Sequence, residues 1–116
     1  MTELVDTVRT VLMENRKNPE ALYMMGLLEE KGIGVPPNKE ASFHYIASAA
    51  RLDYPQALTR LGDYYYSGHH IEKNYEKARI LYEKAAEKNE SQAFLNLALM
   101  QEKGLIPLGT SLGSTE

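Results

Sequence analysis

The chain has 116 residues, no cysteine, a formal net charge of −3, and the hydrophobic and charged fractions of an ordinary soluble domain, 43% and 25%. The missing cysteine excludes a disulfide framework, a cysteine-based zinc site and a thiol nucleophile. The acidic balance, without a cluster of Lys and Arg, argues against nucleic acid or an anionic membrane surface as a partner.

The first six residues carry acids where a signal peptide has a basic start, and no later stretch is apolar for long enough to span a bilayer. We therefore expect a protein of the cytoplasm or nucleus with no direct membrane insertion. Residues 3–16 then predict an amphipathic helix that ends before Asn18 and Pro19. Its apolar residues lie at helical spacing: Leu4, Val5, Val8, Val11 and Leu12.

The remainder of the chain repeats with a period of 36 residues, because residues 19–54 align without a gap on residues 55–90 with nine identities. Unrelated segments of ordinary composition share about two. A fixed period of this length indicates a solenoid built from one supersecondary unit. The identical pairs are Pro19/Pro55, Ala21/Ala57, Leu22/Leu58, Gly26/Gly62, Gly32/Gly68, Asn38/Asn74, Glu40/Glu76, Ala49/Ala85 and Ala50/Ala86.

Each unit predicts two helices joined by a turn. In the first helix of the second unit, helical spacing gathers one packed face, where a glycine lets a neighbouring backbone approach closely. Glycines at 32, 68 and 104 predict left-handed helix ends. Asn38 and Asn74 stand at the N-cap positions of the second helices. The expected packed face consists of Ala57, Leu58, Leu61, Gly62 and Tyr65, matched in the third unit by Ala93, Phe94, Leu97 and Ala98.

The third unit stops after its first helix, so its apolar side lacks the second helix that would cover it. The next four residues, from Leu105 to Leu108, are apolar but too few and too broken by proline to cover the whole stripe, and we expect a partial lid. We expect this end to self-associate, to continue into further chain, or to be covered by a partner.

The pattern resembles the Sel1-like repeat, a relative of the tetratricopeptide repeat. The second unit carries the motif residues Ala57, Leu61, Gly62, Tyr65, Gly68, Lys77, Ala78, Tyr82, Lys84, Ala85 and Ala86. Glu29 departs from it in the first unit, and His69 and His70 in the second turn. The resemblance implies a scaffold or adaptor that holds proteins or peptides on a curved helical surface.

We predict an all-α fold, a right-handed α-α superhelix of about two and a half repeats. Its expected parts are a capping helix at 1–18, repeats at 19–54 and 55–90, the first helix of a partial third repeat at 91–104, and a flexible tail at 105–116. The alternatives are a purely architectural fragment of a longer array and an enzyme that uses the groove as a pocket.

No nucleophile, base and oxyanion donor fall together in the pattern, and the adjacent histidines at 69 and 70 do not suggest a metal site. We expect neither catalysis nor a cofactor. Because first helices line the inner surface in this architecture, helical phase predicts a groove for an amphipathic peptide or helix. Its residues are Glu20, Tyr23, Leu27, Gln56, Thr59, Asp63, Tyr66, Leu95 and Leu99.

Overall fold

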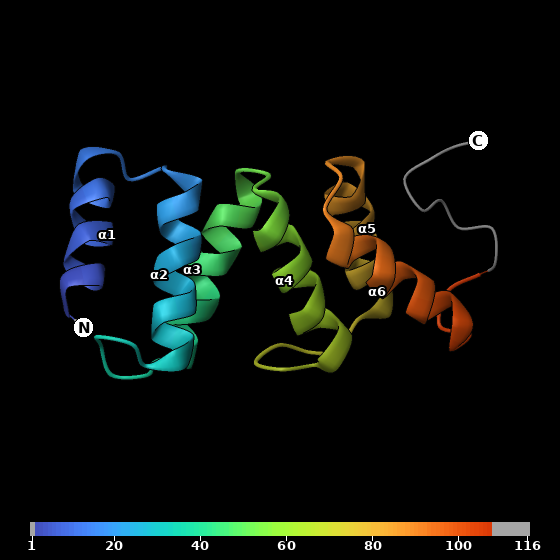
Figure 1. Cartoon of the computed structure of the whole chain (residues 1–116). Helices are drawn as coiled ribbons and strands as arrows, with labels where there is room; N and C mark the ends of the chain where they lie inside the picture. Colours follow the sequence, from blue (N-terminus) through green and yellow to red (C-terminus); the bar gives the residue numbers. More distant parts are fainter. Residues whose placement is uncertain (1, 108–116) are drawn as a thin grey trace. The chain divides into compact units, whose positions relative to one another are not determined.

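The computed structural model describes residues 2–107 and contains six α-helices in that range (Figure 1). No strand occurs among these residues, which confirms the predicted all-α class for the described part of the chain. The chain divides into two compact units between Ala57 and Leu58. The helices are α1 (Thr2–Glu14), α2 (Pro19–Lys31), α3 (Lys39–Arg51), α4 (Pro55–Ser67), α5 (Tyr75–Glu87) and α6 (Ser91–Glu102).

The first helix ends at Glu14, two residues earlier than the sequence predicted. The Asn15 side chain accepts a hydrogen bond from the Lys17 N–H at 3.0 Å, and the Asn18 N–H donates to the Asn15 carbonyl at 3.1 Å. Asparagine competes for backbone groups in this way and favours turns over helix interiors. The helix therefore stops at the first asparagine.

Asparagine side chains cap the N-termini of α2, α3 and α5. The predicted N-caps Asn38 and Asn74 are confirmed. Asn18 caps α2 in the same way, although the sequence analysis treated it only as a signal for the end of the first helix. Each cap satisfies a helical N–H that has no partner inside the helix. The bonds run, at 3.0 Å each, from the N–H groups of Ala21, Ala41 and Lys77 to Oδ1 of Asn18, Asn38 and Asn74.

The predicted left-handed glycines at the ends of the first helices are confirmed, with φ of 70° at Gly32 and 74° at Gly68 and Gly104. The second helices end in the same conformation without glycine, since Asp53 and Asn89 have φ of 63° and 66°. In both cases the next N–H bonds back to a carbonyl five residues earlier. Asp and Asn tolerate this conformation better than other residues with a Cβ atom.

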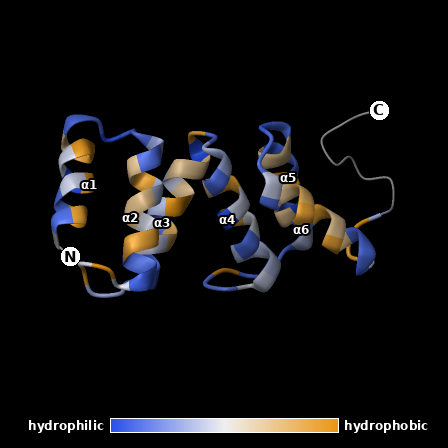
Figure 2. Ribbon diagram, viewed as in Figure 1, coloured by the Kyte–Doolittle hydropathy of each residue, from blue (hydrophilic) through white to orange (hydrophobic). Residues whose placement is uncertain are grey.

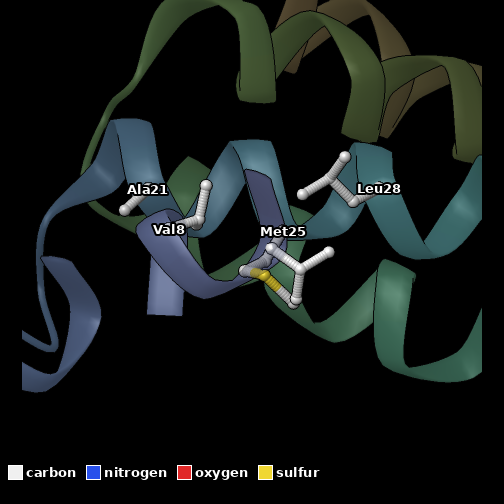
Figure 3. Close-up of a cluster of buried hydrophobic side chains, with 5 residues drawn as sticks. Val8, Ala21, Met25 and Leu28 are labelled. Carbon is white, nitrogen blue, oxygen red and sulfur yellow. The ribbon is translucent and has the colours of Figure 1, made fainter. Parts of the chain in front are cut away.

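Apolar side chains of α1 and α2 form one buried cluster of the first unit (Figure 3). Val5 and Val8 of α1 are buried against α2, and Figure 3 shows Val8 beside Met25. The helix thus covers an apolar face of α2. The whole cluster is Val5, Val8, Ala21, Met25 and Leu28.

The two helices of the first repeat meet at Gly26. A Cβ atom there would lie 2.7 Å from Cδ1 of Ile46, so glycine lets α3 approach the backbone of α2. The buried Ser42 hydroxyl donates to the Gly26 carbonyl at 2.7 Å across the same contact. In the second repeat Gly62 has the same role, and a Cβ atom there would lie 2.6 Å from Cε1 of Tyr82.

Helix α6 is the last helix of the second unit, and only part of its predicted packed face is buried. Leu97 and Met100 are buried, as is Ile106, whose exposed fraction is 6%, and Figure 2 shows the apolar colouring of α6. Leu108 and the remaining tail lie outside the described residues, so the expected lid stays a prediction. Self-association through this end stays a prediction.

Four residues of the predicted packed faces are not fully buried: Leu61, Tyr65 and Phe94 are half-buried, and Ala98 is exposed. Ala98 is exposed, because it lies on the side of α6 that carries Leu95 and Leu99 and not on the side of Leu97. Tyr65 is only half-buried, and the Lys77 ammonium lies 5.4 Å from its ring centroid. Part of the ring thus remains at the surface, as is common for side chains with an apolar body and a polar tip.

Replacement of Gly62 by leucine is expected to lower the free energy of unfolding by about 1–3 kcal/mol or more, because the ring of Tyr82 leaves no room for a side chain. Urea denaturation followed by circular dichroism measures the change. Ser67→Leu, at an exposed position of the same helix, is the control and should change it by less than about 0.5 kcal/mol. An unchanged midpoint for Gly62→Leu would contradict the packing described.

Histidine 70 has a φ of 77°, and the residue 36 positions earlier, Gly34, has a φ of 76°. This conformation costs a residue with a Cβ atom about 1 kcal/mol relative to glycine. We expect His70→Gly to raise the midpoint of thermal unfolding, and His69→Gly, in the same turn, to lower it slightly through the added freedom of the unfolded chain. The reverse order of the two variants would show that contacts of His70 outweigh its backbone strain.

Candidate functional site

Three helices of the second unit bring polar side chains together at Asp63. Oδ1 of Asp63, on α4, accepts a hydrogen bond of 2.6 Å from the Tyr82 hydroxyl of α5. The same oxygen accepts one of 3.1 Å from Nδ2 of Asn96, on α6. Asn96 is in turn held by Gln92, whose Nε2 donates to its Oδ1 at 3.0 Å. The carboxylate is therefore fixed from two neighbouring helices.

The position of Tyr82 follows from the glycine beneath it. Its ring lies against Gly62, is 1% exposed, and crosses α4 so that the hydroxyl reaches the next turn of that helix at Asp63. A buried phenol requires a hydrogen-bond partner, and the carboxylate supplies it. The buried contact between α4 and α5 thus places the Tyr82 hydroxyl beside the exposed residue Asp63.

Burial raises the pKa of the Asp63 carboxyl, although the hydrogen bond from Tyr82 and the charge of Arg60 act in the opposite direction. Asp63 as a whole is exposed, so its carboxylate is only partly removed from water. Burial, together with the hydrogen bond to Asp63 and its negative charge, also raises the pKa of Tyr82, which keeps this phenol protonated as a donor.

A pocket opens beside this carboxylate, with a volume of about 430 Å³ that includes its open mouth. The Lys103 ammonium crosses its edge, donates to the Tyr66 hydroxyl at 3.1 Å, and lies 5.7 Å from the centroid of that ring. The Tyr66 ring also packs against Tyr75, with ring centroids 5.5 Å apart. The lining residues are Asp63, Tyr66, Tyr82, Asn96, Leu99 and Lys103.

Three residues predicted for the groove, Asp63, Tyr66 and Leu99, therefore lie together in one pocket. Leu95 is 52% exposed on α6 but does not line it. The prediction that Thr59 lines the groove is wrong, because this residue is 5% exposed and its hydroxyl donates to the Glu90 carboxylate. Helical phase placed it on the surface, but the neighbouring turn before α6 covers it.

Two of the predicted residues in the first unit, Tyr23 and Glu20, lie near Tyr54. Tyr23 packs against Tyr54 with ring centroids 5.4 Å apart and an angle of 50° between the rings. Burial and the negative charge of Glu20 raise the pKa of Tyr54. Leu27 is half-buried, and Gln56 is exposed. This unit therefore places two packed phenol rings near the carboxylate of Glu20.

Sequence reasoning missed Tyr54, Asn96 and Lys103 as site residues, and it assigned Tyr82 only to the repeat motif. Comparison of the two repeats distinguishes Asp63 and Tyr82, but it contains no signal for the three missed residues. Asp63 and Tyr82 occupy the places of Leu27 and Ile46, 36 residues earlier. The two repeats thus differ in polarity at this contact, although Tyr82 itself is a residue of the repeat motif.

No group of three or more His, Asp or Glu side chains within residues 2–107 has the arrangement of a metal site. None of the helices in the described range has the length and apolar character needed to cross a membrane.

Comparison with known proteins places these features in a family. The family model described as Sel1 repeat matches residues 19–54 and 55–90. Two curated relatives, protein sel-1 homolog 2 of Mus musculus and of Rattus norvegicus, are each 48% identical over 50 residues. That alignment covers 42% of this chain and 7% of either relative, so the chain spans a small part of their length.

Two solved structures share the arrangement of the helices. A Sel1 repeat protein from Oxalobacter formigenes is 33% identical with a TM-score of 0.75, over 88% of this chain and 45% of its own. A protective antigen of uropathogenic Escherichia coli strains, described as having an SLR fold, is 25% identical with a TM-score of 0.74, over 86% of this chain and 21% of its own. The solenoid class predicted from the period is thus confirmed, and the chain belongs to the Sel1 repeat family.

Proposed function

We propose that this chain is a non-enzymatic scaffold or adaptor that binds a peptide or helix of a protein partner on its first helices, α2, α4 and α6. Sel1 repeats generally mediate contacts between proteins, which supports the class of function. The proposal adds the surface and the kind of partner.

The observation that carries the proposal is the chemistry of the accessible side chains on these helices. Half-buried tyrosines stand beside exposed leucines: Tyr66 borders Leu99, which is 42% exposed, and Leu95 is exposed one turn earlier on α6. In the first unit, Tyr23 packs against Tyr54 with the two rings tilted. Tyrosine is favoured at the centres of protein interfaces, because its ring adds large contact area with little loss of conformational freedom.

The polar groups among these side chains are separated and few. Glu20 is exposed in the first unit, and Asp63 and Lys103 flank the pocket of the second. Apolar anchors with isolated charges suit an amphipathic peptide or helix, which presents apolar residues every three or four positions and polar residues between them. A nucleic acid would require a continuous basic surface.

Peptides selected by phage display on the intact chain provide the test. Tyr66→Ala and Tyr23→Ala are each expected to weaken binding of the selected peptides about tenfold or more, the effect of losing an aromatic anchor at an interface. Fluorescence anisotropy of a labelled peptide measures the dissociation constant, and circular dichroism verifies that each variant is folded.

His44→Ala, at an exposed position of the second helix α3, is the control and should leave affinity within about twofold. Peptides that bind tightly but tolerate both tyrosine substitutions would place the binding surface elsewhere. Failure to select any peptide, from libraries that succeed on other repeat proteins, would count against the proposed function itself.

A further inference from the structure

The pocket of the second unit holds one of the chain's own cations against an aromatic ring. The Lys103 ammonium lies 5.7 Å from the centroid of Tyr66 and donates to its hydroxyl at 3.1 Å. Across the pocket stands the Asp63 carboxylate, oriented by Tyr82 and Asn96. A carboxylate and the face of an aromatic ring on one cavity are the two groups that recognise an ammonium or guanidinium ion.

The repeat fold does not require this arrangement. The residues 36 positions before Asp63 and Tyr82 are Leu27 and Ile46, and Ile46 packs on its glycine without any polar partner at position 27. The same helical contact is therefore achieved in the first repeat with apolar side chains. The polar cluster is therefore present in the second repeat and not in the first, although Tyr82 itself belongs to the repeat motif.

We propose that this pocket binds a basic side chain, lysine or arginine, of the partner, and that Lys103 is an internal occupant which the partner's cation displaces. This inference rests on the proposed function, for which it names the chemistry of one contact. The incoming cation lies over the Tyr66 ring and pairs with Asp63.

The electrostatics of the carboxylate favour a cation over an anion. Partial burial raises the pKa of Asp63, so the hydrogen bonds from Tyr82 and Asn96 do not fully replace its lost hydration. A positive ligand removes this deficit, whereas an acidic ligand would approach a second negative charge. The remaining charge near Asp63 includes Arg60, which stabilises the carboxylate, and Glu90, which opposes it.

Displacement of Lys103 costs little. Lys103 is exposed at the C-terminal end of α6, and its contacts with Tyr66 are a single hydrogen bond and a cation–π contact at the surface. Contacts of this kind contribute little when water has access to them. Lys103 can therefore swing into solvent while a partner's side chain, tethered by its own apolar contacts, takes the place over the ring.

The test uses the full chain and small probes instead of an unidentified partner. N-acetyl-arginine amide is titrated into isotope-labelled protein, and the side-chain amide signal of Asn96 reports occupation of the pocket. N-acetyl-citrulline amide, the neutral isostere, and N-acetyl-glutamate amide are the matched controls. We expect saturable shifts of the Asn96 signal with the arginine probe and none with either control.

Two variants separate a cation site from an anion site, because they change affinity in opposite directions. Asp63→Asn keeps the shape of the side chain and its acceptor for Tyr82, and should weaken binding of the arginine probe at least about fivefold. Lys103→Met removes the competing cation and should strengthen it about twofold to fivefold. Amide spectra verify that both variants are folded.

Several results would overturn the inference: no shift of Asn96 with the arginine probe, equal shifts with citrulline, or weaker binding after Lys103→Met. A response to the glutamate probe that Lys103→Met abolishes would identify an anion site instead. These results leave the proposed function standing if the displayed peptides still depend on Tyr23 and Tyr66. If the arginine probe binds as expected and no peptide does, the proposed function fails and the pocket remains a cation site.

Discussion

The close approach of the first and second helix at one glycine in each repeat is the contact on which the other features depend. At Gly26 and Gly62 there is no space for a Cβ atom, because the side chains of Ile46 and Tyr82 lie directly against the two backbones. Asparagine caps and left-handed helix ends, repeated at the same positions, set the turns on either side of this contact. The small residues allow the helices to pack at short distance, and the turns fix where each helix starts and stops.

The same contact permits different chemistry in each repeat. In the first, Ser42 bridges to the Gly26 carbonyl, and the residue against the glycine is apolar. In the second, the residue against Gly62 carries a hydroxyl that extends past the helix to Asp63. The buried part of Tyr82 performs the packing, while its hydroxyl orders the pocket. The ring of Tyr82 therefore contributes to stability, and its hydroxyl contributes to the chemistry of the surface.

The fold was largely predictable from the sequence, because its signals are local and repeat. The identities at a fixed period, the capping asparagines and the left-handed glycines each predicted an element that the structure contains. The site was less predictable, since helical phase gives the direction of a side chain but not what covers it. Helical phase placed Thr59 on the surface, yet Thr59 is buried and bonds to Glu90 in the turn between α5 and α6. Lys103 reaches Tyr66 only because the helices bring together residues 37 positions apart.

Because Tyr82 belongs both to the contact between α4 and α5 and to the pocket wall, occupation of the pocket is linked to the integrity of the second unit. Separation of the helices would scatter Asp63, Tyr66 and Asn96, so a ligand bound among them is released when the unit opens. By mass action, such a ligand lowers the population of the open form in proportion to its concentration over its dissociation constant. Protection of the backbone amides of α4 and α5 against solvent exchange therefore becomes a measure of occupancy.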